Sequence, residues 1–318
     1  MSSELETLES CTLCGSRSLK KITQIDGKVT PHRFGIVRCN DCNLMFTSPR
    51  LTEAANEAMY GEAYYRGEGF DQSVSYESLD EEAEARRGEC EGIIQKIRVL
   101  CPLPDPRVLD VGCGTGVLLQ ALKAAGFSQV EGQEFSKYAA EHAHKRTGVT
   151  VHQGDLAELA KSSARYDVIN ATEVLEHVRA PLSFLTAVEA LLAPGGVFVY
   201  STGNARGIYA RVLGTKWPYL VPEGHLYYYD PTTVRRLLEK AGLEAVGPDQ
   251  LSAAQRRRLA EAESHIAHSQ LLYVGLSAPG AKGLIFRTAA LANVAPAKLL
   301  VSWVVGKGEL PSGRKRAA

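Results

Sequence analysis

The sequence has no excess of charge of either sign, because 36 Lys and Arg residues balance 36 Asp and Glu residues. This balance argues against a broad electrostatic attraction to nucleic acid, which a strongly basic surface would provide. Internal repeats and long low-complexity segments are also missing, and 45% apolar and 23% charged residues are ordinary for globular proteins. The 318 residues are enough for about two domains.

The sequence also shows neither the pattern of a signal peptide nor a long uninterrupted apolar run. The first ten residues, MSSELETLES, are acidic and polar and contain neither the basic nor the apolar region of a signal peptide. We therefore expect a cytoplasmic protein. The most apolar stretch, 284–305, is interrupted by Arg287, Asn293, Pro296 and Lys298, whereas a bilayer span needs ~20 mostly apolar residues. This stretch favours a buried helix, with a helix lying on a membrane surface as the alternative.

Changes in composition divide the chain into four regions. We expect a small cysteine-containing unit at 1–50, a helical lid or linker at 51–106, an α/β domain at 107–248, and a helical appendage with a basic tail at 249–318. In the third region, short apolar runs alternate with amphipathic stretches, which predicts a Rossmann-like parallel sheet covered by helices. The predicted strands are 108–111, 129–133, 150–152, 166–171, 196–201 and 243–246, and the predicted helices are 117–125, 137–147, 181–192 and 232–241. Two later runs, 271–276 and 299–305, both qualify as a last strand.

Four of the seven cysteines form two C-x-x-C pairs, Cys11 with Cys14 and Cys39 with Cys42. Each pair makes a knuckle, and four thiolates at this spacing form a tetrahedral zinc site of the ribbon type. We expect the zinc to be structural, because such a site is closed and the short segment lacks a large core of its own. Zinc ribbons also bind nucleic acid, but the basic residues here are few and scattered.

Three glycines, Gly112, Gly114 and Gly116, lie in the motif VLDVGCGTG, where a predicted strand turns into a predicted helix. Glycines at such a turn allow tight backbone geometry and the close approach of a ligand. Two acids end the next predicted strands. Glu134 is placed to accept hydrogen bonds from the hydroxyls of a ribose, and Asp155 from the amine of an adenine. This arrangement predicts a site for a nucleoside-containing cofactor.

These motifs, with GQE at the second strand, YDVINATEVLEHV at the fourth and LLAPGGVFV before the fifth, resemble class I S-adenosylmethionine-dependent methyltransferases. The G-x-G-x-G spacing differs from the G-x-G-x-x-G of NAD dehydrogenases. The resemblance implies in-line transfer of the sulfonium methyl group to a nucleophile. It further implies cofactor contacts from Asp110 and the glycine loop (Gly112, Cys113, Gly114, Gly116) to the methionine part, from Glu134 to the ribose, and from Asp155 and Leu156 to the adenine.

The residues Glu173, Glu176 and His177 follow the fourth strand, and at spacings i, i+3 and i+4 they would share one face of a helix. With His225 they are candidate ligands for Mg²⁺, Mn²⁺ or Fe²⁺. The pattern resembles the metal-dependent O-methyltransferases of the ubiquinone pathway and of small-RNA ends, in which the ion lowers the pKa of the attacked hydroxyl. In the alternative, no metal binds, His225 or His177 is a general base, and Glu173 orients loops or carries a proton.

The nature of the acceptor is indicated by the segment that follows the cysteines. A ribbon followed by Tyr64 and Tyr65 is similar to the N-terminal part of bacterial methyltransferases that act on sugars and natural products, and implies a lid that carries these tyrosines. Trp217, Tyr219 and Tyr227–Tyr229 are candidates for lining the acceptor pocket, where aromatic rings can stack on a sugar or phenol ring. We expect O-methylation of a small acceptor, such as a sugar, a polyketide or a quinone precursor, with lipid-linked acceptors contacted through 284–305. The alternatives are an RNA-modifying methyltransferase, a C-methyltransferase of nucleotide-linked sugars and a non-catalytic scaffold.

Overall fold

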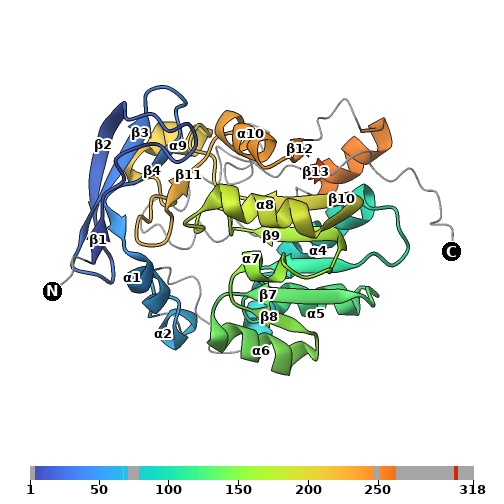
Figure 1. The fold of residues 1–318 in the computed structure, drawn as a ribbon. Coiled ribbons are helices and arrows are strands. Elements are labelled where there is room, and N and C mark those ends of the chain that lie inside the picture. The colour runs from blue at the N-terminus through green and yellow to red at the C-terminus, as the bar shows by residue number, and fades with distance from the viewer. Residues whose placement is uncertain (1–3, 67, 71–78, 246–250, 263–303, 307–318) are drawn as a thin grey trace.

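The computed structural model describes residues 4–66, 68–70, 79–245, 251–262 and 304–306. A seven-stranded sheet with helices on both faces forms the larger part, and a four-stranded antiparallel sheet lies at one side of it (Figure 1). The α/β, Rossmann-like fold expected from the sequence is confirmed. The predicted core strands and helices agree with the observed ones to within a few residues.

Five parallel strands make the centre of the large sheet, in the order β8-β7-β6-β9-β10. Their bounds are β6 (Val108–Val111), β7 (Val130–Glu134), β8 (Val151–Gln153), β9 (Tyr166–Thr172) and β10 (Leu192–Ser201). The antiparallel strand β13 (Val304–Gly306) lies between β10 and β12 (Glu244–Ala245). β13 comes from the region predicted as a helical appendage, yet it is part of the core sheet. The competing run 271–276 is outside the described residues.

Alternate residues of the central strands face opposite sides of the sheet. Leu109, Ile169 and Phe198 pack into a cluster with helices α8 (Pro181–Leu191) and α10 (Pro231–Lys240). Their neighbours Val108 and Val168 pack into a second cluster on the other side. That cluster includes residues of α4 (Arg87–Leu100), α5 (Val117–Ala124) and α6 (Lys137–Thr147). Burial on both faces explains why these strands read as continuous apolar runs in the sequence.

Several helix ends are determined by local sequence. The hydroxyl of Ser136 accepts a hydrogen bond from the amide of Ala139 at the start of α6, and Gly148 ends the helix with φ +65°. Asp230 and Thr233 form a capping box at the start of α10. A short helix, α7 (Leu156–Leu159), begins at Asp155, whose carboxylate accepts from the amide of Ala157.

Helices also form much of the described chain between the cysteine-containing segment and β6. They are α1 (Glu53–Ala58), α2 (Glu62–Tyr65), α3 (Leu79–Ala85) and α4. Residues 253–262 are also helical. No helix in the described ranges has the length and apolar character needed to cross a bilayer. Of the apolar stretch 284–305, only residues 304 and 305 are described, and they belong to β13.

The small sheet has the order β11-β4-β3-β2 and is antiparallel throughout. Its strands are β2 (Leu19–Asp26), β3 (Arg33–Cys39), β4 (Met45–Thr47) and β11 (Tyr227–Tyr228), and a separate pair joins β1 (Leu5–Glu6) to β5 (Arg50–Leu51). Helix α9 (Ile208–Leu213) lies near it (Figure 1), and the short 3-10 helix η1 (Gly214–Lys216) follows α9 directly. Because β11 follows the core strands in sequence, the small sheet is shared between the N-terminal region and the core.

Candidate active site

The glycine loop connects β6 to α5, and all three of its glycines have positive φ. A Cβ atom on Gly116, at φ +88°, would lie 3.1 Å from Ala143 of α6, so this glycine permits close packing between helices. A Cβ atom on Gly114, at φ +53°, would meet no atom within 4 Å. Gly114 therefore borders open space, as expected for a backbone segment that a ligand approaches.

The three acids predicted to contact the cofactor lie at the carboxyl ends of the adjacent strands β6, β7 and β8, or just after them. The Oδ1 atom of Asp110 accepts a hydrogen bond from Asn170 at 2.8 Å. Burial raises the pKa of Asp110 to about 7, against the opposing effect of this hydrogen bond. Asp155 is exposed and caps α7, and Leu156 beside it is buried. Ligands of open α/β sheets bind at this edge.

Glu134, the last residue of β7, is hydrogen-bonded to the glycine loop. Its Oε2 atom accepts the amide hydrogen of Gly114 at 2.9 Å, and its Oε1 atom accepts that of Ser136 at 2.8 Å. Burial raises the pKa of this carboxyl, and a hydrogen bond from Tyr65 is among the effects that lower it. Tyr65 also stacks on Tyr138 at 6.0 Å. The lid tyrosine named from the sequence thus lies against the acid predicted to bind the ribose.

The Glu-x-x-Glu-His segment is a turn, so the predicted helix is wrong. Thr172 ends β9, and Glu173 directly after it has a φ of +54°. A non-glycine residue in this region of φ interrupts the helical repeat. Glu173 is hydrogen-bonded with Ser201, whose hydroxyl donates to Oε1 of Glu173 at 3.0 Å.

Three of the four predicted metal ligands nevertheless converge. Glu176, His177 and His225 each offer a ligand atom within 4.8 Å of the other two, and Glu173 is outside this group. The rings of His177 and His225 have centroids 4.8 Å apart and cross at 71°. Glu176 is fully buried, and His225 is 8% exposed. The convergence comes from the turn and from the loop before β11, because no single helix carries these residues.

Both histidines use Nδ1 for hydrogen bonds to the backbone. Nδ1 of His225 lies 2.7 Å from the carbonyl oxygen of Tyr219, and Nδ1 of His177 lies 3.0 Å from that of Gly224. Since a carbonyl oxygen only accepts, Nδ1 of His225 donates the hydrogen of this bond. Nδ1 of His177 is also within 3.1 Å of the hydroxyl of Tyr60, which can donate or accept. Metal-bound histidines usually donate their second nitrogen in this way.

The carboxylate of Glu176 completes this donor set. Its Oε1 atom accepts a hydrogen bond from the phenol of Tyr219. Thr202 and Glu173 are further hydrogen-bonding neighbours of this carboxylate, although its buried Oε2 atom has no partner within hydrogen-bond geometry among the described residues. Burial raises the pKa of Glu176, while the bond from Tyr219 opposes that rise. A buried oxygen without a partner beside two imidazoles fits a divalent cation.

The four cysteines of the N-terminal region also converge, with all four Sγ atoms within 4.8 Å of one another. The backbone amides of residues 13 and 14 are hydrogen-bonded to the sulfur of Cys11, and those of residues 41 and 42 to the sulfur of Cys39. Each knuckle ends in a residue with positive φ, Gly15 and Asn43. Four sulfurs, two of them supplied with N–H donors by equivalent turns, fit a tetrahedral zinc ion.

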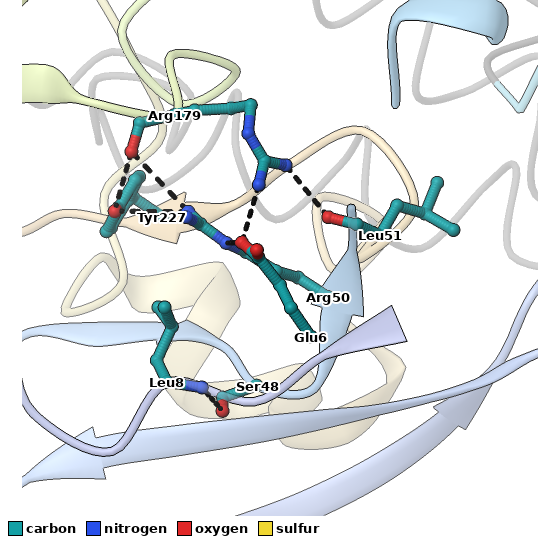
Figure 2. A network of polar contacts seen from close by, with 7 residues as sticks. All are labelled: Glu6, Leu8, Ser48, Arg50, Leu51, Arg179 and Tyr227. Carbon is teal, nitrogen blue, oxygen red and sulfur yellow. Dashed lines mark hydrogen bonds and ion pairs between the residues drawn. The ribbon is translucent and has the colours of Figure 1, made fainter. Parts of the chain in front are cut away.

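Just after the turn, Arg179 belongs to a polar network that the sequence did not reveal (Figure 2). The guanidinium of Arg179 donates to the carbonyl oxygen of Leu51 at 2.8 Å and to the carboxylate of Glu6. Nε of Arg50 donates to the same carboxylate at 2.8 Å, and the hydroxyl of Tyr227 donates to the carbonyl oxygen of Arg179 at 3.2 Å. The N-terminal strands thus anchor the chain just after His177.

The other aromatic candidates occupy different positions. Tyr64 is buried and packs on Phe70, with ring centroids 5.0 Å apart. Trp217 is buried and stacks on Tyr219 at 5.0 Å, and Tyr219 in turn lies 4.2 Å from the ring of His225. Trp217 is therefore separated from the cluster by one ring. Tyr60, which the sequence reasoning did not single out, brings its hydroxyl to 3.1 Å from Nδ1 of His177.

Comparison with known proteins shows the family of this chain. The profile of the family described as "Methyltransferase domain" matches residues 83–247, which is more than half of the chain. The chain belongs to this family and is an S-adenosylmethionine-dependent methyltransferase of class I.

Similar curated proteins include ubiquinone biosynthesis O-methyltransferases. That of Burkholderia pseudomallei (strain 1710b) is 32% identical over 156 residues, which cover 45% of this chain and 67% of the relative. That of Cereibacter sphaeroides (strain ATCC 17029) is 34% identical over 157 residues, covering 46% and 63%. The match thus leaves about a third of each relative uncovered.

Solved structures of similar chains are also methyltransferases. The magnesium protoporphyrin IX methyltransferase of Synechocystis PCC 6803 with bound SAH is 18% identical, with a TM-score of 0.46 and coverage of 62% of this chain and 91% of that one. CalS10, an amino pentose methyltransferase from Micromonospora echinaspora, is 31% identical, with a TM-score of 0.34 and coverage of 40% and 56%.

Proposed function

We propose that the protein transfers the methyl group of S-adenosylmethionine to a hydroxyl of a small acceptor that carries a second oxygen beside it, such as a catechol or a vicinal diol. The observation that carries this proposal is the convergence of Glu176, His177 and His225 within 4.8 Å, with Nδ1 of each histidine hydrogen-bonded to a backbone carbonyl oxygen. The relatives named as ubiquinone biosynthesis O-methyltransferases support the choice of oxygen as the nucleophile.

The cofactor would lie along the carboxyl edge of β6, β7 and β8. There Asp110 and the glycine loop would hold the methionine part, Glu134 the ribose, and Asp155 with Leu156 the adenine. A Cβ atom on Gly112 would lie 2.6 Å from a methyl group of Val174, so the glycine loop lies against the turn that carries Glu176. This proximity supports transfer between a cofactor on the loop and an acceptor at the cluster.

The side chains at the cluster would orient the acceptor and keep its hydroxyl away from bulk water. A divalent ion such as Mg²⁺ or Mn²⁺, held by Glu176, His177 and His225, would bind neighbouring acceptor oxygens and lower the pKa of the attacked hydroxyl. Without an ion, Nε2 of His225 or of His177 would take the hydroxyl proton as a general base. We assign the cysteine cluster a structural zinc, because four thiolates leave no position for a substrate.

The decisive experiment is Mn²⁺ binding to the zinc-loaded protein in the presence of S-adenosylhomocysteine. Saturable binding that is lost in both Glu176→Ala and His225→Ala, and kept in His152→Ala, would support the site. His152 is a suitable control because it contacts Glu131, away from the cluster. Absence of binding in the wild type would exclude the metal and make the histidines general-base candidates. Methylation of a catechol but not of the matching monophenol would support the acceptor class.

A further inference from the structure

The carboxylate of Glu223, two residues before His225, is enclosed by the tip of the hairpin between β2 and β3. Its oxygens accept the amide hydrogens of Lys28 at 2.7 Å, Val29 at 3.1 Å and Thr30 at 2.8 Å, and the hydroxyl of Thr30 at 2.8 Å. Glu223 is only 1% exposed. Four donors on one buried carboxylate form a strong, specific connection between the small sheet and the loop that carries His225.

A second connection runs through Thr47, at the end of β4. Its hydroxyl donates to the carbonyl oxygen of His225 at 2.9 Å, and its amide donates to that of Leu226 at 2.9 Å. Thr47 is fully buried. The amide of Leu226 donates in turn to the carbonyl oxygen of Glu176 at 2.8 Å. The backbone at His225 is therefore held between the small sheet on one side and the Glu176 turn on the other.

We propose that Thr47 and Glu223 are positioning residues, through which the cysteine-containing sheet holds His225 against Glu176 and His177. The proposal rests on the function proposed above for His225. The cysteine cluster belongs to the same unit, because Cys39 ends β3 and its amide donates to the carbonyl oxygen of Leu44, just before β4. The N-terminal region thus helps to position a residue of the proposed reaction site.

Simple packing between two sheets would explain the same contacts but predicts a different response to substitution. Loss of packing would weaken the whole protein, including the cofactor site. Loss of positioning would affect the cluster alone, because Glu134 and the glycine loop are held by bonds within the core. Thr47→Val keeps the shape of the side chain but removes its hydroxyl donor, so it separates these two explanations.

The test compares Thr47→Val, Thr47→Ser and Glu223→Gln with the control Thr23→Val, which lies in β2 of the same sheet. We expect Mn²⁺ affinity at the cluster to fall at least tenfold in Thr47→Val and Glu223→Gln, and to recover in Thr47→Ser. Zinc content and S-adenosylhomocysteine affinity should stay at the wild-type values. Equal losses of Mn²⁺ and S-adenosylhomocysteine affinity, or no change in either, would overturn the proposal.

A second measurement keeps this proposal separate from the metal site itself. In protein labelled with ¹⁵N-histidine, the Nδ1 hydrogen of His225 should exchange slowly in the wild type, because it is bonded to the carbonyl oxygen of Tyr219. In Thr47→Val this hydrogen should exchange at least tenfold faster, whether or not Mn²⁺ binds. If the wild type binds no Mn²⁺ but the exchange rate increases in Thr47→Val, the proposed metal site is wrong and the positioning role of Thr47 is supported. An unchanged exchange rate refutes positioning.

Discussion

The phenol of Tyr219 donates a hydrogen bond to Oε1 of the buried Glu176 and accepts the amide hydrogen of Gly203 at 2.6 Å. A Cβ atom on Gly203 would lie 2.2 Å from the ring of Tyr219, so only glycine allows this approach. One aromatic residue thus connects the backbone after β10, the carboxylate of the cluster and, by ring contact at 4.2 Å, His225.

Replacing Tyr219 by Phe should destabilise the protein by about 2 kcal/mol, because it removes a hydrogen bond from a buried carboxylate and from a buried amide. Chemical denaturation would measure the change in the free energy of unfolding. Tyr229→Phe is the matched control, since the hydroxyl of Tyr229 is buried without a hydrogen-bond partner in the described part of the chain. Equal unfolding free energies for the two variants would show that the Tyr219 bonds contribute nothing to stability.

Replacing Glu134 by Gln should weaken S-adenosylhomocysteine binding about tenfold to a hundredfold. The ribose hydroxyls would no longer donate to a charged carboxylate. Because a hydrogen bond to a charged group contributes about 1.5–3 kcal/mol, its loss corresponds to this change in affinity. Titration calorimetry would measure the dissociation constant. Glu131→Gln is the control, because Glu131 lies in the same strand but contacts His152 and Tyr166 instead of the glycine loop. Wild-type affinity in Glu134→Gln would remove Glu134 from the cofactor site.

The part of the site that follows the core pattern could be predicted from the sequence. Buried strands appear in the sequence as apolar runs, and the carboxyl ends of parallel strands meet at one edge of the sheet. For this reason the sequence predicts that Asp110 and Glu134 lie near the glycine loop, which the structure confirms for both positions. The turn at Glu173 could not be predicted, because its positive φ depends on tertiary contacts with Ser201. The bond from Lys28 to Glu223 joins residues 195 positions apart, and spacing within a motif gives no signal of it.

The network around Glu6 predicts a loss of stability in acid. The pKa of Glu6 is lowered overall, because the hydrogen bond from Arg50 and the charges of Arg179 and Arg50 outweigh the opposing effect of burial. A carboxyl with a lowered folded pKa stabilises the protein above its unfolded pKa, and this contribution disappears as the pH falls through the folded value. Glu6→Gln should therefore melt below the wild type at pH 7, and the gap should close towards pH 3. A constant gap in melting temperature would contradict this mechanism.

Asp110 should have the opposite pH dependence. Its folded pKa of about 7 is above the ordinary carboxyl value, so the folded protein binds a proton that the unfolded chain has released. Stability of the cofactor-free protein should therefore decrease as the pH rises from about 4 to 7, by up to roughly 4 kcal/mol for a shift of about three units. Asp110→Asn should flatten this decrease between about pH 4 and 7, whereas Asp26→Asn, at an exposed position on β2, should leave it unchanged.

S-adenosylhomocysteine gives this last prediction a second readout. If Asp110 contacts the methionine part, the ammonium group of the ligand should favour the charged carboxylate and lower its pKa. Binding near pH 6 should then release a proton, which calorimetry in buffers of different ionisation enthalpy would detect. The Asp110→Asn variant should release fewer protons when S-adenosylhomocysteine binds. Parallel stability profiles for wild type and variant, together with equal proton release, would mean that Asp110 is already ionised in the free protein and that its burial is compensated by the surrounding groups.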